Sequence, residues 1–112
     1  MTIHKMKLYN EPFEMIKNGL KTIELRLNDE KRQKLAVDDV IEFTEIKSEN
    51  KINVQVIALH KYPDFAELYK HFEKTQLGYK EDEIAQPEDM EEYYSPENIK
   101  KYGVLGIEVK VI

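Results

Sequence analysis

Short stretches of alternating hydrophobic and polar residues recur along this chain, as in β-strands that are buried on one face. Five stretches show the alternation: residues 3–9, the run GLKTIELRL at 19–27, and residues 40–46, 52–59 and 104–112. In the last one, Leu105, Ile107 and Val109 fall on one face of the strand. The pattern therefore predicts five or six short strands, mostly antiparallel.

Two or three helices are predicted between these strands. Each begins at a capping residue or a proline, namely Asn10 with Pro12, Asp64 with Glu67 three residues later, and Ser95 with Pro96. The first and third end near glycines, Gly19 and Gly103. Residues 77–94 lack a clear period, so their conformation stays open. This order of elements favours a small β-barrel, an all-β core with flanking helices and α+β content, formed as a single domain over residues 1–112.

The composition is that of a soluble globular protein, with 41% hydrophobic and 35% charged residues. The chain has no cysteine, which excludes disulfides, thiolate zinc sites and a cysteine nucleophile. No apolar run approaches the roughly 20 residues of a membrane helix, and the N-terminal residues lack the apolar stretch of a secretory signal. We therefore expect a cytoplasmic protein without membrane contact. The oligomeric state is open, with a monomer favoured.

Charge is unevenly distributed along the chain, whose net charge is −5. Residues 4–34 carry eight basic and five acidic residues, whereas residues 81–92 carry seven acidic residues and no basic one. The acidic balance argues against tight, non-specific binding of nucleic acid, which uses a strongly basic face, but it leaves room for a small basic site. Residues 81–92 are expected to form a solvated flap.

Several familiar sites are absent from the sequence. It has no G-x-G-x-x-G or G-x-x-x-x-G-K-[ST] loop for phosphates and no G-x-S-x-G nucleophile turn. The three histidines, His4, His60 and His71, are widely spaced. Glu67 and His71 stand four residues apart on the second predicted helix and could share a metal, but an exposed helix face is the better interpretation. We predict no metal and no cofactor.

The run GLKTIELRL raises the main functional question. Its strand directs apolar residues to one face and Thr22, Glu24 and Arg26 to the other. From the pattern alone, Glu24 and Arg26 form either a surface ion pair worth about 0–1 kcal/mol or part of a polar pocket. In a pocket, Arg26 could hold a phosphate or stack on a base, and Glu24 could accept hydrogen bonds from a nucleobase edge. Lys21 could donate to a carbonyl or phosphate, or act as a general base once removed from water.

With this run, the turn at Asp38-Asp39, the strand VIEF and the ending KYGVLGIEVKVI in view, the chain resembles the ASCH family. That family is a branch of the PUA-like β-barrels, and the likeness covers nearly the whole chain. Its most specific part is G-x-K-T-I-E-x-R at residues 19–26. The resemblance implies a closed or nearly closed barrel, a polar cleft beside this strand and an RNA-linked role. It also raises an enzymatic activity, because some bacterial ASCH proteins are amidohydrolases that act on N4-acetylcytidine with a lysine, a threonine and a glutamate.

Carried over by position, Lys21 and Arg26 match the lysine and the arginine of the family motif. Glu24 stands where the amidohydrolases place their threonine, and Thr22 is close to that position only in sequence. The resemblance therefore favours binding over hydrolysis. It implies catalytic candidates Lys21, Glu24 and Thr22, and ligand-binding candidates Lys21, Glu24, Arg26 and Tyr62.

Two sets of candidates remain open. The family's catalytic glutamate lies in the following helical region, where Glu67 and Glu73 both qualify. Among the aromatic residues, Tyr62 at the end of a strand is free to reach a ligand, and so are Tyr93 and Tyr94.

Three functional hypotheses follow. The first is an ASCH-type domain that binds RNA or a modified nucleoside in a polar cleft at the GLKTIELR strand. The second is an amidohydrolase that removes an acyl group from N4 of cytidine. The third is a protein-interaction module in which residues 81–92 dock a basic partner.

Overall fold

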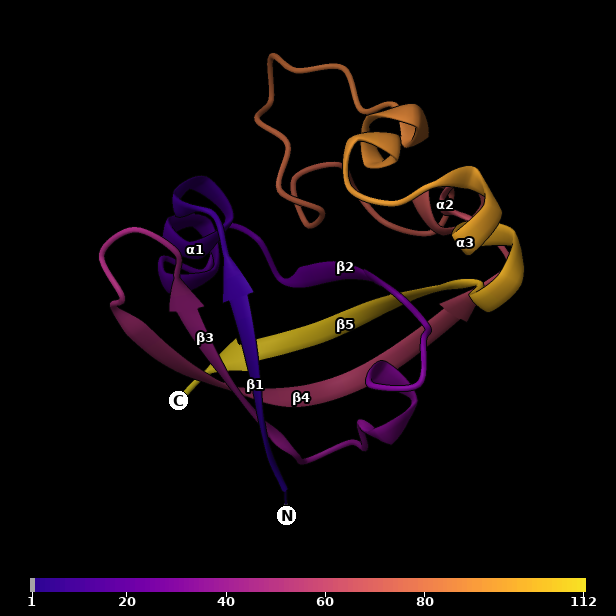
Figure 1. Ribbon diagram of the computed structural model, residues 1–112. Coiled ribbons are helices and arrows are strands. Elements are labelled where there is room, and N and C mark those ends of the chain that lie inside the picture. The colour runs from indigo at the N-terminus through magenta and orange to yellow at the C-terminus, as the bar shows by residue number, and fades with distance from the viewer. Residues whose placement is uncertain (1) are drawn as a thin grey trace.

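Five strands form one curled sheet in the computed structural model, which describes residues 2–112 (Figure 1). They are β1 (Ile3–Leu8), β2 (Ile23–Leu27), β3 (Val40–Glu45), β4 (Lys51–Tyr62) and β5 (Val104–Val111). Their order across the sheet is β1-β3-β4-β5-β2. The β1–β3 pair is parallel and the other three pairs are antiparallel. The predicted set of short, mostly antiparallel strands is therefore confirmed, although β4 is longer than predicted and contains a register shift between Val56 and Ala58.

The sheet curls into a half-barrel, so its two edge strands come together without forming a ladder. Arg26 on β2 donates a hydrogen bond from Nη2 to the carbonyl of Lys7 on β1, at 2.9 Å. A side chain thus bridges the gap between the edges, which we call the seam. The expectation of a closed or nearly closed barrel is met only in this partial form.

Three α-helices flank the sheet: α1 (Asn10–Lys17), α2 (Phe65–Tyr69) and α3 (Pro96–Tyr102), with short 3₁₀ turns η1 (Arg32–Lys34) and η2 (Pro87–Glu92). The caps at Asp64 and Ser95 are confirmed, because their side chains accept hydrogen bonds from the backbone amides three residues on. The predicted cap at Asn10 is wrong. Tyr9 holds the N-cap position in extended backbone and Asn10 is already helical.

Two hydrophobic clusters make up the core. The first lies inside the sheet under α1 and includes Phe13, Phe43 and Ile107. The second lies between β2, β5 and the group of α2, η2 and α3, which Figure 1 shows gathered at one end of the sheet, and it includes Ile23 and Leu68. Neither face of β2 simply meets solvent. Its apolar face packs in the core, and its polar face lines the pocket described next.

Candidate functional site

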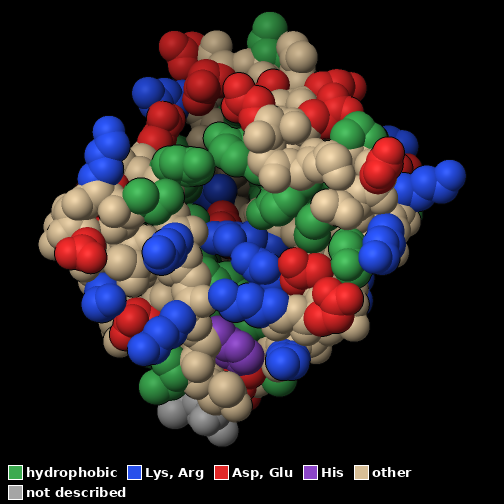
Figure 2. Space-filling view, in the orientation of Figure 1, with side chains coloured by type: hydrophobic (Ala, Val, Ile, Leu, Met, Phe, Trp, Pro, Cys, Tyr) green, Lys and Arg blue, Asp and Glu red, His purple; other side chains and the backbone are tan. Residues whose placement is uncertain are grey.

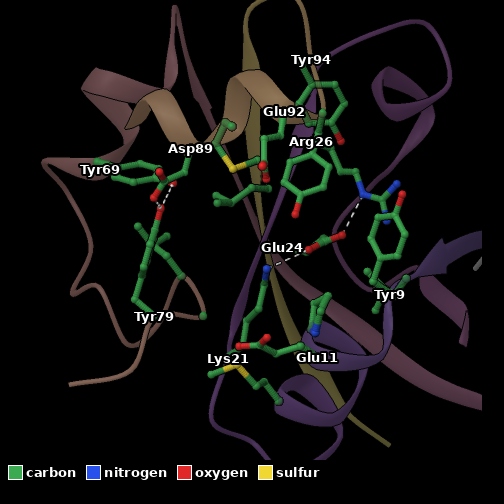
Figure 3. Close-up of a pocket in the computed structure, with 18 of the residues that line it drawn as sticks. Tyr9, Glu11, Lys21, Glu24, Arg26, Tyr69, Tyr79, Asp89, Glu92 and Tyr94 are labelled. Carbon is green, nitrogen blue, oxygen red and sulfur yellow. Dashed lines mark hydrogen bonds and ion pairs between the residues drawn. The ribbon is translucent and has the colours of Figure 1, made fainter. Parts of the chain in front are cut away.

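A pocket of about 480 Å³ opens beside the seam, between β2, α1 and the chain from Tyr69 to Tyr94. Figure 2 looks into this hollow, and Figure 3 shows its lining side chains. Three groups of side chains line it: the charged set Lys21, Glu24 and Arg26, the tyrosines Tyr9, Tyr69, Tyr79, Tyr93 and Tyr94, and the acidic residues Glu11, Glu83, Asp89 and Glu92. Five of the seven tyrosines in the chain thus face one cavity.

Glu24 lies at the centre of a buried charge triad, with Lys21 and Arg26 reaching it from opposite sides (Figure 3). Lys21 Nζ is 3.2 Å from Glu24 Oε1, and Arg26 Nε donates to Glu24 Oε2 at 2.8 Å. Glu24 is only 4% exposed, and the side chains of Lys21 and Arg26 are 10% and 12% exposed. The interpretation of Glu24 and Arg26 as a surface ion pair is therefore wrong, because Glu24 is buried and most of the Arg26 side chain is covered.

Glu24 and Arg26 are both ionised at neutral pH. Burial by itself would raise the pKa of Glu24, but the charges and hydrogen bonds of Lys21 and Arg26 hold this pKa below its ordinary value. Burial would likewise lower the pKa of Arg26, and the charge of Glu24 instead raises it. The pocket therefore presents a carboxylate acceptor fixed beside two cationic donors.

The side chain of Lys21 packs against the backbone of Gly78. The φ of Gly78, +102°, is one that side-chain-bearing residues rarely adopt, and a Cβ placed there would lie 2.9 Å from Cδ of Lys21. A glycine at this point allows the backbone to approach the lysine stem closely. Gly78 belongs to the chain after α2, so its contact with Lys21 is set by tertiary packing.

A hydroxyl network holds the wall opposite the triad. The hydroxyls of Tyr69 and Tyr79 are 2.9 Å apart, and Tyr79 also donates to Oδ2 of Asp89 at 2.8 Å. Burial, together with these two hydrogen bonds, raises the pKa of Tyr79. The network ties α2, the following loop and η2 together and leaves aromatic rings facing the cavity.

Two other sets of rings shape the interior and the mouth. Tyr94 stacks on Phe65, with ring centroids 6.0 Å apart, and its hydroxyl points toward Glu24 in Figure 3. Tyr9 and Tyr93 lie at the mouth, 6.2 Å apart and each more than half exposed. Exposed flat rings at an opening can stack on a planar ligand.

Several predicted site residues lie outside this lining. Lys21, Glu24 and Arg26 come together as predicted, and Tyr93 and Tyr94 join them. Tyr62 instead stacks on His71 with centroids 4.9 Å apart, and Glu67 pairs with Lys70 on an exposed helix face; Thr22 and Glu73 are likewise not among the lining residues. Thr22 uses its backbone to link Gln76 and Val109.

Sequence reasoning missed the tyrosines at positions 9, 69 and 79 and the acidic rim. The signal that could have found part of this set is the density of tyrosine and acidic residues in the aperiodic stretch 77–94. The conformation of such a stretch depends on the side chains that it packs against around the cavity, and not on a regular helix or strand pattern of its own.

The histidines serve packing and pairing. His4 lies 2.9 Å from Asp39 and His60 lies 3.0 Å from Glu108. Across residues 2–112 no group of three or more His, Cys, Asp or Glu side chains is arranged to hold a metal ion. Within the same range no helix is both long and apolar enough to cross a membrane.

Comparison with known proteins places the fold and the family. The ASCH domain family matches residues 6–112. The chain belongs to the ASCH domain family. None of the curated proteins matches it. ASCH domains are PUA-like and are proposed to bind RNA, so the predicted PUA-like barrel is confirmed as the half-barrel described above.

Solved structures similar to this ASCH domain include two of nearly equal length. The hypothetical protein PH0355 is 30% identical with a TM-score of 0.84, over 99% of this chain and 100% of that one. Protein PF0455 from Pyrococcus furiosus is 33% identical with a TM-score of 0.72, over 99% and 98%. A mutant of ZmASCH from Zymomonas mobilis is 16% identical with a TM-score of 0.70, over 98% and 70%, and this likeness concerns the fold alone.

Proposed function

We propose that this ASCH domain binds one nucleobase, of RNA or of a modified nucleoside, in the pocket floored by Lys21, Glu24 and Arg26. The observation that carries the proposal is the buried, ionised carboxylate of Glu24 held between two cations at the base of a tyrosine-lined cavity. A volume of about 480 Å³ is within the range of small-molecule sites. The planar rings in the wall provide surfaces on which a base can stack, and the charged groups in the floor can orient its hydrogen-bonding edge.

The donor and acceptor arrangement favours a particular ligand edge. Each oxygen of Glu24 uses one lone pair for its cation and retains another, and the ammonium of Lys21 has two N–H groups beyond the one aimed at Glu24. Lys21 can therefore donate to a carbonyl while Glu24 accepts from the adjacent N–H. A ring lactam has this edge, and cytosine and N4-acylated cytosine offer an equivalent pair, an acceptor at ring N3 beside the donor N4–H.

The amidohydrolase is the second candidate, and the contact of 3.2 Å between Lys21 and Glu24 favours it as a proton-transfer pair. Because Thr22 is not a lining residue, the attacking group would be water. Water would add to the acetyl carbon, the C–N4 bond would break, and the amine would take the proton. Acetate and cytidine would be the products.

One NMR titration of labelled protein separates these functions. Cytidine and N4-acetylcytidine are added in turn to the native chain and to Lys21→Ala, with Lys61→Ala as the control that loses an exposed lysine on β4. Binding gives shifts at Lys21, Glu24 and Arg26 that Lys21→Ala abolishes and Lys61→Ala retains. A growing acetate signal that depends on Lys21 would favour the hydrolase.

Absence of shifts with either compound would contradict a nucleoside pocket. The interaction hypothesis would then come first, and it predicts that neutralising the acidic residues of 81–92 abolishes function while Lys21→Ala has no effect.

A further inference from the structure

Cationic side chains gather at the seam directly below the pocket, where Figure 2 shows Lys and Arg atoms in one group. Five residues form this group, which we call the basic seam: Lys5 and Lys7 on β1, Arg26 on β2, and Lys31 and Arg32 at η1. Two of them, Lys7 and Arg26, also line the pocket. The basic seam and the pocket are therefore continuous.

Backbone carbonyls of β1 hold two of these cations in place. Arg26 donates to the carbonyl of Lys7, and Nζ of Lys31 donates to the carbonyl of Lys5, each at 2.9 Å. The two carbonyls are two residues apart on one edge strand, so both charges are fixed along the same line. Such anchoring reduces the entropy lost when the cations meet an anion.

The basic seam carries more positive charge than its own acidic partners balance. Glu24 pairs with Arg26 and Asp29 pairs with Arg32. Within residues 2–112 no carboxylate lies within 4.0 Å of the amines of Lys5, Lys7 or Lys31. Three cations are thus available to a ligand.

Two further observations describe the electrostatics of this group. Nε of Arg32 is buried without a hydrogen-bond partner among the described residues. Partial burial, followed by the charges of Arg32 and Arg26, lowers the pKa of Lys31. A bound oxyanion would relieve the repulsion between these like charges.

Three of the four acidic residues around the pocket come from the chain after α2, and the fourth, Glu11, comes from α1. These three are Glu83, Asp89 and Glu92. Figure 2 shows Asp and Glu atoms gathered above the hollow, on the side away from the central group of Lys and Arg atoms. A ligand that bears one negative group would therefore be oriented, with that group toward β1 and its uncharged part toward the tyrosines.

We propose that the basic seam binds one phosphate group of a nucleotide whose base occupies the pocket. This inference rests on the proposed nucleobase site and adds the ligand class, a nucleoside monophosphate or one phosphodiester of RNA. Lysine and arginine donors suit phosphate oxygens, and charge-assisted hydrogen bonds to them are short and strong. The acidic rim disfavours a second phosphate on the opposite side.

The test compares affinities for cytidine, its 5′- and 3′-monophosphates, a cytidine trinucleotide and inorganic phosphate on the full chain by NMR titration. We expect a phosphate-bearing ligand to bind about tenfold more tightly than cytidine. Lys31→Ala, and separately Lys7→Ala, should lower this ratio of affinities, whereas Lys61→Ala on β4, the middle strand of the sheet, should leave it unchanged. Lys7 is exposed, so its replacement keeps the fold and guards against misfolding of the other variant.

Each outcome decides between the two proposals. Equal affinities for cytidine and its phosphates would overturn the phosphate site and leave the nucleobase site standing. Binding of inorganic phosphate at the seam without any response to cytidine would support the phosphate site and contradict the base pocket. A gain with monophosphates identifies a free nucleotide, and a gain with the trinucleotide alone identifies RNA; either supports the phosphate site.

Discussion

Glu24 is the residue on which the site depends most. It is buried, and both of its oxygens are committed to cations. Replacing Glu24 with Gln leaves Lys21 and Arg26 buried without a counter-charge, which we expect to lower the free energy of unfolding by about 3 kcal/mol. Urea unfolding measures this loss. The matched control is Glu67→Gln, whose exposed pair with Lys70 should be worth less than about 1 kcal/mol.

Glu24 also makes the free energy of unfolding depend on pH, and the lowered pKa sets the direction of that dependence. Because the folded-state pKa of Glu24 lies below its ordinary value of 4.5, its contribution is complete above that pH and is lost as the pH falls through the folded pKa. Unfolding free energy should therefore fall less steeply with acid in Glu24→Gln than in the native chain. A part of the slope will remain, since hydrogen bonds also lower the pKa values of Asp39 and Glu45. Identical slopes would show that folding does not shift the pKa of Glu24, which would contradict the ion pairs described here.

Gly78 offers a second prediction at the scale of single residues. Gly78→Ala brings a Cβ against the stem of Lys21, so we expect weaker nucleoside binding in addition to the strain of a positive φ, about 1 kcal/mol. Gly19→Ala is the control, because Gly19 has a φ of +76° but open space around its Cβ. Both variants should lose stability in urea, Gly78→Ala the more because its Cβ also meets Lys21, and only Gly78→Ala should lose affinity. Equal affinity in the two variants would contradict the idea that contact with Gly78 positions Lys21.

At the scale of elements, the chain after α2 is held by one hydroxyl network. Tyr79→Phe removes the hydroxyl that joins Tyr69 to Asp89. We expect amide hydrogen exchange to quicken across η2 and the loop before it, with little change in β3 or β4, because the freed segment opens locally. Tyr102→Phe removes a hydroxyl at the end of α3, outside this network, and should leave exchange in η2 unchanged. Uniform acceleration over the sheet would mean that the network supports the whole fold instead.

At the scale of the whole molecule, β5 joins the two hydrophobic clusters. Its Val104 belongs to the second cluster, and Leu105 and Ile107 belong to the first. We propose that residues 1–112 form a single cooperative domain for this reason. Tyrosine fluorescence reports the second cluster, since the chain has no tryptophan and four tyrosines pack there, while far-ultraviolet circular dichroism reports the sheet. The two urea transitions should coincide, and separate midpoints would contradict a single domain.

The local features of the fold were predictable because they depend on neighbouring residues. Alternation with period two marks the strands, and Asp64 and Ser95 mark helix starts because each cap closes on an amide three residues away. The charged face of β2 follows from the same alternation. The prediction failed at Asn10, where the extended backbone of Tyr9 sets the start of α1 instead.

The sequence by itself determined the strands, the helices, the family motif and the grouping of Lys21, Glu24 and Arg26 on one short run. Only the tertiary structure decided that this triad is buried and that five tyrosines surround it. It also placed Tyr62 outside the lining of this pocket, at the end of β4, where its ring stacks on His71. The physical reason is range: period and capping act over a few residues, whereas the pocket is made by β1, β2, α1 and residues 69–94, which meet only when the sheet curls.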